Sequence, residues 1–279
     1  MTPPAPTPEP TRRPTPQEDP PVTATAVRPD ETFAQTLQRL GGVQKGAKGA
    51  PAYSRFVNRR AGRVLAAWAY RAGLTPNQVT LVSAAWTFSA IALLALAPPA
   101  WWTGVLVAVL LLVGYAFDSA DGQVARLRGG GSIAGEWLDH VIDAVKVSSL
   151  HLALLVGLFR ADVVADVWLL VPLAYSAVWS VLFFTMILND QLRRQAGQTM
   201  RATADGSRPS VLRSLVVAPT DYGVLCLAFL LYGATLPFLV VYGLLGLATA
   251  GYLALAMGSW FREMRGLRRP TGQALGGEQ

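Results

Sequence analysis

The chain has 279 residues, of which 52% are hydrophobic and only 15% charged. Soluble domains carry about a quarter charged residues, so the chain is either a polytopic membrane protein or an unusually apolar soluble one. Disorder over most of its length is excluded, and the single cysteine, Cys226, excludes an intrachain disulfide framework. The net charge of +7 fits basic cytoplasmic loops in a membrane protein or nucleic-acid binding in a soluble one.

The N-terminal region is rich in proline: its first 30 residues contain 10 of the 19 prolines. This composition predicts a disordered tail over residues 1–49, and the absence of an apolar core segment argues against a signal peptide. From about residue 53 to 73, arginine, tryptophan and leucine recur at helical spacing, which predicts an amphipathic interfacial helix. A plain juxtamembrane helix is the alternative. Thr75 and Pro76 then predict the start of the next helix.

Six apolar segments follow, most of them close to the ~20 residues that a transmembrane helix needs. They run over about Val79–Ala97, Trp102–Phe117, Trp137–Phe159, Val167–Leu188, Tyr222–Leu236 and Phe238–Phe261. The predicted fold is therefore an all-α polytopic membrane protein with six transmembrane helices after the interfacial helix. It forms one membrane domain over residues 50–265, followed by a disordered C-terminal tail over 266–279.

The connections between these segments alternate in charge. With six spans, the strongly basic connections and both termini fall on one side of the membrane, which the positive-inside rule makes cytoplasmic. The basic residues are then topogenic, and nucleic acid is excluded as a partner. Asp221, at the start of the fifth segment, is expected to be a helix N-cap or first-turn acid.

Five acidic residues lie at the junction of the second and third segments: Asp118, Asp121, Glu136, Asp139 and Asp143. Ionisable groups at membrane depth are costly and are functional by default. Helical spacing places Asp118 and Asp121 on one face with Gly122, Ala125 and Arg126, and Gly135 on one face with Asp139 and Asp143. The Gly129-Gly130-Gly131 turn is expected to bring the two helices together antiparallel, so that four carboxylates converge.

Four close carboxylates without as many bases cannot all ionise unless cations are bound. Divalent ions with oxygen ligands meet this need, and a pair of them is a recurring device for displacement at phosphorus. Gly122, Ala125 and Gly135 leave room for a phosphate-bearing ligand, and Arg126 offers a fork for its oxygens. Interhelical salt bridges and helix caps are the alternative explanation of the acids.

From Asp118 to Asp143 the sequence reads D-S-A-D-G-Q-V-A-R, eight residues, then G-E-W-L-D-H-V-I-D. This resembles the signature of the CDP-alcohol phosphotransferase family, D-x2-D-G-x2-A-R-x8-G-x3-D-x3-D, at every fixed position. The resemblance covers roughly residues 53–265. It implies a phospholipid-biosynthetic enzyme that transfers a substituted phosphate from a CDP-alcohol, such as CDP-diacylglycerol, to an acceptor hydroxyl with release of CMP.

The resemblance also implies residue roles. Asp118, Asp121, Asp139 and Asp143 would bind two Mg²⁺ or Mn²⁺ ions, with Asp143 as general base. The CDP-alcohol would be bound by Gly122, Ala125, Arg126, Gly135, Ser132, Asn77 and Thr80. For Ser132, Asn77 and Thr80, a turn serine and a helix start are equally natural explanations. A homodimer in a bacterial cell membrane is expected, with the active site on the cytoplasmic side.

The substrate pair is less defined. The segment G-E-W-L-D-H resembles choline and ethanolamine phosphotransferases and makes Glu136 and His140 possible participants, although His140 could simply pack on a neighbouring helix. S-R-F-V-N-R, at residues 54–59, resembles inositol-phosphate-transferring members, but Ala144 stands where their bacterial forms usually carry arginine. Lys146 could contact a phosphate or carboxylate, or pair with Asp143. His151, deeper in the membrane, is expected to be structural.

Two alternatives come from other classes. Acidic residues could line the ion path of a transporter, although no internal repeat is found and the acids cluster at one membrane face. The chain could also be a catalytically silent member of the family, against which the complete motif argues.

Overall fold

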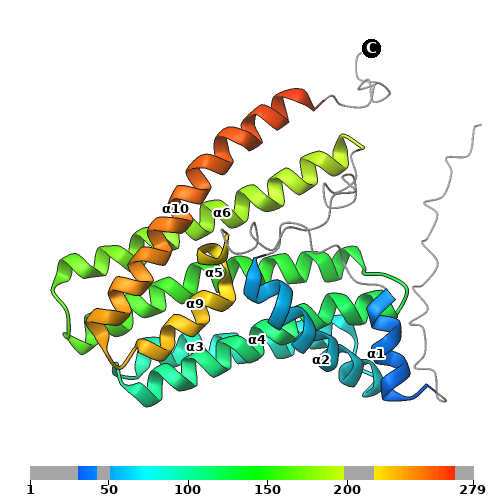
Figure 1. Cartoon of the computed structure of the whole chain (residues 1–279), viewed down its shortest axis with the longest axis horizontal. Helices are drawn as coiled ribbons and strands as arrows, with labels where there is room; N and C mark the ends of the chain where they lie inside the picture. The colour runs from blue at the N-terminus through cyan, green and yellow to red at the C-terminus, as the bar shows by residue number, and fades with distance from the viewer. Residues whose placement is uncertain (1–30, 43–50, 198–216, 268–279) are drawn as a thin grey trace, which may run out of the picture.

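The computed structural model describes residues 31–42, 51–197 and 217–267, and these residues contain helices and no strand (Figure 1). The helices are α1 (Phe33–Gly42), a π-helical turn η1 (Ser54–Asn58), α2 (Arg59–Arg71), α3 (Pro76–Leu96), α4 (Trp101–Leu127), α5 (Ile133–Ala161), the 3-10 turn η2 (Asp166–Leu169), α6 (Leu170–Gln195), the 3-10 turn η3 (Ala218–Thr220), α9 (Tyr222–Ala228), the 3-10 turn η4 (Phe229–Leu231) and α10 (Thr235–Gly266). The all-α prediction is confirmed for this part of the chain.

Five helices of the described residues are long and apolar enough to cross a membrane. They are α3, α4, α5, α6 continued from η2, and α10. In each of these helices, half or less of the most apolar 18-residue stretch is buried inside the protein, which is typical of helices that face lipid. An integral membrane protein is thus supported by length and composition.

Helix α3 begins where the sequence predicts. The Thr75 hydroxyl accepts a hydrogen bond from the backbone N–H of Gln78, whose side chain accepts one from the N–H of Thr75, and Pro76 occupies the first helical position. This capping box satisfies N–H groups that would otherwise lack a partner. It fixes the start of α3, which packs against both acid-bearing helices, α4 and α5.

Helix α3 packs against both α4 and α5, while α5 packs on α6 and α6 on α10. Small residues make these approaches close: a Cβ at Gly114 of α4 would lie 2.4 Å from Thr87 Oγ1, and one at Gly157 of α5 would lie 2.0 Å from the Leu94 carbonyl oxygen. Such glycines allow helix backbones to meet in a membrane. Helices α4 and α5 thus share α3 as a packing partner, and they approach each other through the side chains of the acidic motif.

The turn between α4 and α5 is nevertheless the predicted triple glycine. Gly129 and Gly130 have φ values of 93° and 139°, which side chains with a Cβ rarely adopt. Ser132 then caps α5, its hydroxyl accepting from the Gly135 N–H at 3.0 Å. The turn reverses the chain so that both helices present their acids at one end of the bundle.

The predicted disordered tail over residues 1–49 is wrong for residues 33–42, which form α1. This helix packs against α2, with Leu40 buried and the Arg39 guanidinium over the Tyr70 ring. Figure 1 shows α1 beside α2 at one end of the bundle. Residues 1–30, 43–49 and 268–279 of the two predicted tails lie outside the described residues, and α10 continues to Gly266.

The predicted fifth span over Tyr222–Leu236 is not one helix. Its helical part ends at Leu231, after ten residues, and α10 starts at Thr235. Ten residues rise about 15 Å, half of a ~30 Å bilayer core. The segment still runs along α4, because the Tyr222 ring meets the Tyr115 ring edge-on at 5.1 Å and Gly233 lies against Trp101.

Helix α2 has one buried and one open face. Ala66, Ala67 and Tyr70 are buried, and a Cβ at Gly62 would meet the Ser119 side chain of α4 within 3 Å. Trp68 on the other face is half exposed. The predicted amphipathic character is thus present in a helix that is anchored on α4 next to the acidic motif.

Candidate functional site

Three of the four predicted carboxylates converge. Asp118 of α4 and Asp139 and Asp143 of α5 each offer an oxygen, and these oxygens all lie within 4.8 Å of one another. The helical spacing of the motif puts each pair on one face, and packing on α3 turns the two faces toward each other. The predicted convergence is therefore confirmed for these three side chains.

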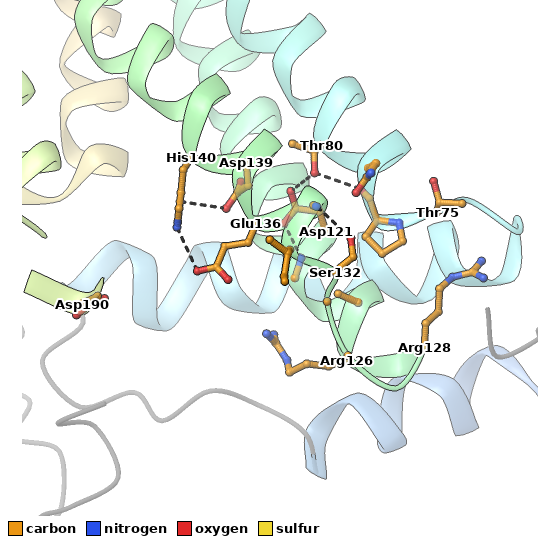
Figure 2. A pocket seen from close by; sticks show the side chains of 18 of the residues that line it. Thr75, Thr80, Asp121, Arg126, Arg128, Ser132, Glu136, Asp139, His140 and Asp190 are labelled. Atoms are coloured by element: carbon orange, nitrogen blue, oxygen red, sulfur yellow. Dashed lines mark hydrogen bonds and ion pairs between the residues drawn. The ribbon is translucent and has the colours of Figure 1, made fainter. Parts of the chain in front are cut away.

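Asp121, the fourth acid, is buried and held at both oxygens. The Thr80 hydroxyl of α3 donates to Oδ2 at 2.6 Å, and the Gly122 N–H donates to Oδ1 at 2.5 Å. Figure 2 shows Asp121 and Thr80 joined beside Asp139. Thr80, predicted as a nucleotide contact, therefore also orients a carboxylate, a role that the sequence did not indicate.

Lys146 lies against the acids. Its ammonium nitrogen is 2.6 Å from Asp118 Oδ1 and 3.0 Å from Asp143 Oδ1, and 3.4 Å from Ser83 Oγ. The ion pair with Asp143, one of the two sequence interpretations, is present. The bond to Asp118, which joins α5 to α4, was not predicted.

The donor set fits a divalent metal. Carboxylate oxygens are the ligands that Mg²⁺ and Mn²⁺ prefer, and one lysine neutralises only part of the charge of four aspartates. Asp118 and Asp143 each keep about a quarter of their side-chain surface exposed, so an ion could reach them. The single lysine balances one of the four carboxylate charges, and close carboxylates remain ionised together only when further cations are bound.

A cavity of about 660 Å³ opens on the Asp121 and Asp139 side of the cluster. All seven residues predicted to bind the CDP-alcohol line it: Asn77, Thr80, Gly122, Ala125, Arg126, Ser132 and Gly135. Figure 2 shows side chains of this cavity from α3, α4 and α5. Residues up to 58 positions apart in the sequence thus surround one space.

Within this cavity, Arg126 fits an anionic ligand. Its Nε is buried and, like that of Arg128, has no hydrogen-bond partner among the described residues. The two arginines differ at the end of the guanidinium, because Arg128 donates from Nη2 to the Leu74 carbonyl oxygen at 3.0 Å and lies over the Tyr70 ring. Ser132 Oγ is engaged as the cap of α5, which is the alternative explanation given for it. Asn77 faces Gly135, where a Cβ would lie 2.9 Å from its Oδ1.

Glu136 and His140 also line the first cavity, together with Asp190 and Arg194 of α6. Arg194 pairs with Glu136 at 2.5 Å, and His140 Nε2 is 3.6 Å from Glu136 Oε1. The sequence indicated a topogenic role for the arginines after the fourth span and did not indicate a contact with α5. Their approach to α5 depends on how α6 packs, which no local pattern reveals.

A second cavity of about 390 Å³ lies on the other side of the acids. Asp118, Asp143 and Lys146 line it with aromatic side chains that the sequence did not single out: Tyr115, Trp179, Phe183, Tyr222 and Tyr252. The four motif aspartates thus stand between two cavities, with Asp121 and Asp139 facing one and Asp118 and Asp143 the other.

Asp221 is a helix N-cap, as expected. Its carboxylate accepts hydrogen bonds from the N–H groups of Gly223 and Ser54, both at 3.0 Å. Burial raises the pKa of this carboxyl, and the backbone hydrogen bonds act in the opposite direction. The bond to Ser54 ties the start of α9 to the turn before α2.

His151 is buried among Tyr175, Trp179 and Tyr242 and hydrogen-bonds the Tyr242 hydroxyl through Nδ1. It joins α5 to α10 inside the bundle and faces neither cavity. The prediction of a structural histidine is confirmed.

Five membrane-length helices and a carboxylate cluster between two cavities define an integral membrane protein with the donor set of a divalent-metal site. The family model for CDP-alcohol phosphatidyltransferases matches residues 73–259. The chain belongs to this family.

A phosphatidylinositol phosphate synthase of Corynebacterium glutamicum is 40% identical over 77 residues, which are 28% of this chain and 33% of that protein. The match thus spans about a third of this relative. Two solved structures of a Mycobacterium tuberculosis phosphatidylinositol phosphate synthase are also similar. The one with manganese and citrate has a TM-score of 0.46 at 21% identity, over 71% of this chain and 87% of that one. The one with CDP-DAG bound has a TM-score of 0.46 at 19% identity, over 74% and 94%.

Proposed function

We propose that the protein transfers a substituted phosphate group from a CDP-alcohol, such as CDP-diacylglycerol, to the hydroxyl of an acceptor alcohol and releases CMP. The observation that carries this proposal is the position of the motif aspartates between two cavities. One cavity is lined by every residue that the family resemblance assigns to the donor, and the other leaves room for an acceptor on the far side. Membership of the family supports the same reaction.

Asp118, Asp121, Asp139 and Asp143 would hold the metal, as two Mg²⁺ or Mn²⁺ ions. Bound there, the metal would neutralise phosphate charge and act as a Lewis acid on the phosphoryl oxygens. Thr80 and the Gly122 N–H keep the Asp121 carboxylate oriented, as outer partners of metal ligands do. Arg126, with its unpartnered Nε, would bind phosphate oxygens of the donor.

Asp143 is proposed as the general base. It lines the second cavity, so an acceptor hydroxyl there could give its proton to the carboxylate. The acceptor oxygen then bonds to the β-phosphorus of the donor, the bond from this phosphorus to the bridging oxygen breaks, and CMP leaves with that oxygen. Arg126, in the first cavity, would stabilise the charge on the departing phosphate.

CMP release from purified protein tests the proposal, with and without Mg²⁺ or Mn²⁺ and with a panel of CDP-alcohol donors. Metal-dependent release is expected, and Asp143→Asn should lower it at least ~100-fold, the lower bound for a lost acid–base group. Asp162→Asn makes the same change at the exposed far end of α5 and should not affect turnover. No release from any donor would contradict the proposal and favour a transporter or a silent family member.

Two observations support two different classes of acceptor. The curated relative is named a phosphatidylinositol phosphate synthase, which supports an inositol phosphate acceptor. The second cavity has aromatic walls, which attract ammonium groups. This supports an acceptor without a phosphate group, as in choline- or ethanolamine-type transfer. Comparing phosphorylated and unphosphorylated acceptors in the CMP assay distinguishes these classes.

We propose six membrane crossings, with the short α9–η4 segment as the fifth crossing. Its contacts with α4 at Tyr115 and Trp101 support a passage between the two ends of the bundle. The amphipathic α2 would lie at the cytoplasmic interface, with the active site and both termini on that side of a bacterial cell membrane. The family resemblance supports a homodimer. Labelling of single cysteines placed at Gly130 and Asp162 in sealed vesicles tests the sidedness: reagent should reach them from opposite sides.

A further inference from the structure

We propose that the ammonium group of Lys146 occupies one of the two metal positions when that position is empty, so that the ion held by Asp118 and Asp143 binds only by displacing it. The inference rests on the metal site of the proposed function. It concerns a lysine that the family motif does not include.

The geometry makes Lys146 a ligand of the same oxygens that a metal would use. Its Nζ lies 2.6 Å from Asp118 Oδ1 and 3.0 Å from Asp143 Oδ1. These two aspartates belong to the group whose oxygens lie within 4.8 Å of one another. Lys146 is only 7% exposed, so its charge is committed to the acids and is not shared with solvent.

Charge balance requires the ammonium to leave. Four carboxylates neutralise two divalent ions in full, so an ammonium retained on Asp118 and Asp143 would add a positive charge to a cluster that is already neutral. With the second ion absent, the same ammonium relieves the repulsion between these two close carboxylates. Lysine and the second ion are therefore alternatives at these oxygens.

The structure also provides a place for the displaced group. Lys146 lines the second cavity of about 390 Å³, and its four-carbon stem has the rotational freedom to swing the ammonium away from the acids.

The other side of the cluster is built differently. Asp121 is held by a neutral hydroxyl and a backbone N–H, so the ion there displaces no cation. The two ion positions should consequently differ in affinity.

Mn²⁺ binding to the metal-stripped full chain in detergent tests this, with bound ion measured by calorimetry and free ion by electron paramagnetic resonance. Wild type should bind two ions in clearly separated steps. Lys146→Met should tighten the weaker step about tenfold or more, the lower end of what partners of metal ligands contribute, and change the tighter step little. Lys146→Arg keeps a cation and should keep separated steps. Ser83→Ala removes the 3.4 Å contact of the ammonium and the 2.8 Å hydrogen bond from Ser83 to the Gly114 carbonyl oxygen, but neither aspartate contact of Lys146. Its two metal-binding steps should stay separated as in wild type.

Displacement can be observed in wild-type protein, independently of variants that fail to fold. The chain has three lysines, Lys45, Lys48 and Lys146, so protein labelled with ¹³C at the lysine Cε gives few signals. The Lys146 signal, assigned by its loss in Lys146→Met, should shift during the second step of a Mg²⁺ titration. An unmoved signal at saturation, or equal affinities for the two ions in wild type, would overturn the inference. If no variant binds metal, the proposed function fails instead.

Discussion

The Thr80 hydroxyl of α3 donates a 2.6 Å hydrogen bond to Asp121 Oδ2 of α4. The same hydroxyl oxygen lies 3.1 Å from the Pro76 carbonyl oxygen, so the first turn of α3 places it close to both acceptors. By fixing the first turn of α3, the capping box at Thr75 therefore helps to orient the Asp121 carboxylate. A helix that carries none of the acids controls the orientation of one of them.

Thr80→Val should lower the Mn²⁺ affinity and the metal-dependent turnover about 10- to 100-fold, because loss of a partner of a metal-binding carboxylate has that effect. Valine has nearly the shape of threonine, so the packing of α3 on α4 should persist. Thr80→Ser restores the hydroxyl and should recover most of the affinity. Equal metal affinity in the valine variant and wild type would exclude the orienting role.

Ser132 should have two separable effects. Ser132→Ala removes the N-cap of α5 and should cost about 1 kcal/mol of stability, seen as a lower thermal unfolding midpoint in detergent. Ser132→Asn keeps a capping side chain and should unfold near the wild-type temperature. If the hydroxyl also contacts the donor, the donor KM rises in both variants. A donor KM that rises only in the destabilised alanine variant would show that Ser132 acts as a helix cap and does not contact the donor.

Gly157→Ala should destabilise the bundle by about 1–3 kcal/mol, the usual cost of overpacking. Its Cβ would lie 2.0 Å from the Leu94 carbonyl oxygen, so α5 must shift away from α3. Gly251→Ala in α10 is the matched control, since a Cβ there has nothing within 4 Å and should not lower the unfolding midpoint. Equal midpoints for the two variants would contradict the close α3–α5 packing.

Asp221 should make stability depend on pH. Burial raises its folded-state pKa above the ordinary aspartate value, so the folded protein binds this proton more tightly than the unfolded chain. The resulting stabilisation is complete below the ordinary value and is lost as pH rises through the raised pKa. As the pH rises from the ordinary aspartate pKa through the raised one, the free energy of unfolding of wild type should therefore fall relative to that of Asp221→Asn. If the difference in unfolding midpoint between the two proteins stays the same at every pH, folding does not change the pKa of Asp221.

The acidic motif could be read from the sequence because its information is local. Fixed gaps of three and four residues place Asp118 with Asp121, and Asp139 with Asp143, on single helix faces, and the glycines between them predict the turn. Asp221 as a cap follows from the same kind of local pattern. Even α1 left a local signal, since Phe33, Leu37 and Leu40 stand at helical spacing behind the proline-rich segment.

What could not be predicted depends on packing between distant segments. The bond from Lys146 to Asp118 spans 28 positions and the Arg194–Glu136 pair spans 58. Both require the order of helices around α3 and α6. The early end of the fifth span at Leu231 is similar, because hydrophobicity continues through the break. Gly233 and Pro237 are typical of a turn there, but these two residues do not reveal where the preceding helix ends.

The two cavities on opposite sides of the aspartates have a kinetic consequence. A donor in the cavity of Asn77 and Arg126 and an acceptor in the cavity of Tyr115 and Trp179 would not compete for space, so both could be present before any bond breaks. The reaction should then follow a ternary-complex rate law, with intersecting double-reciprocal plots. Labelled CMP should not exchange into the CDP-alcohol in the absence of acceptor, because no step stores the phosphate group on the protein.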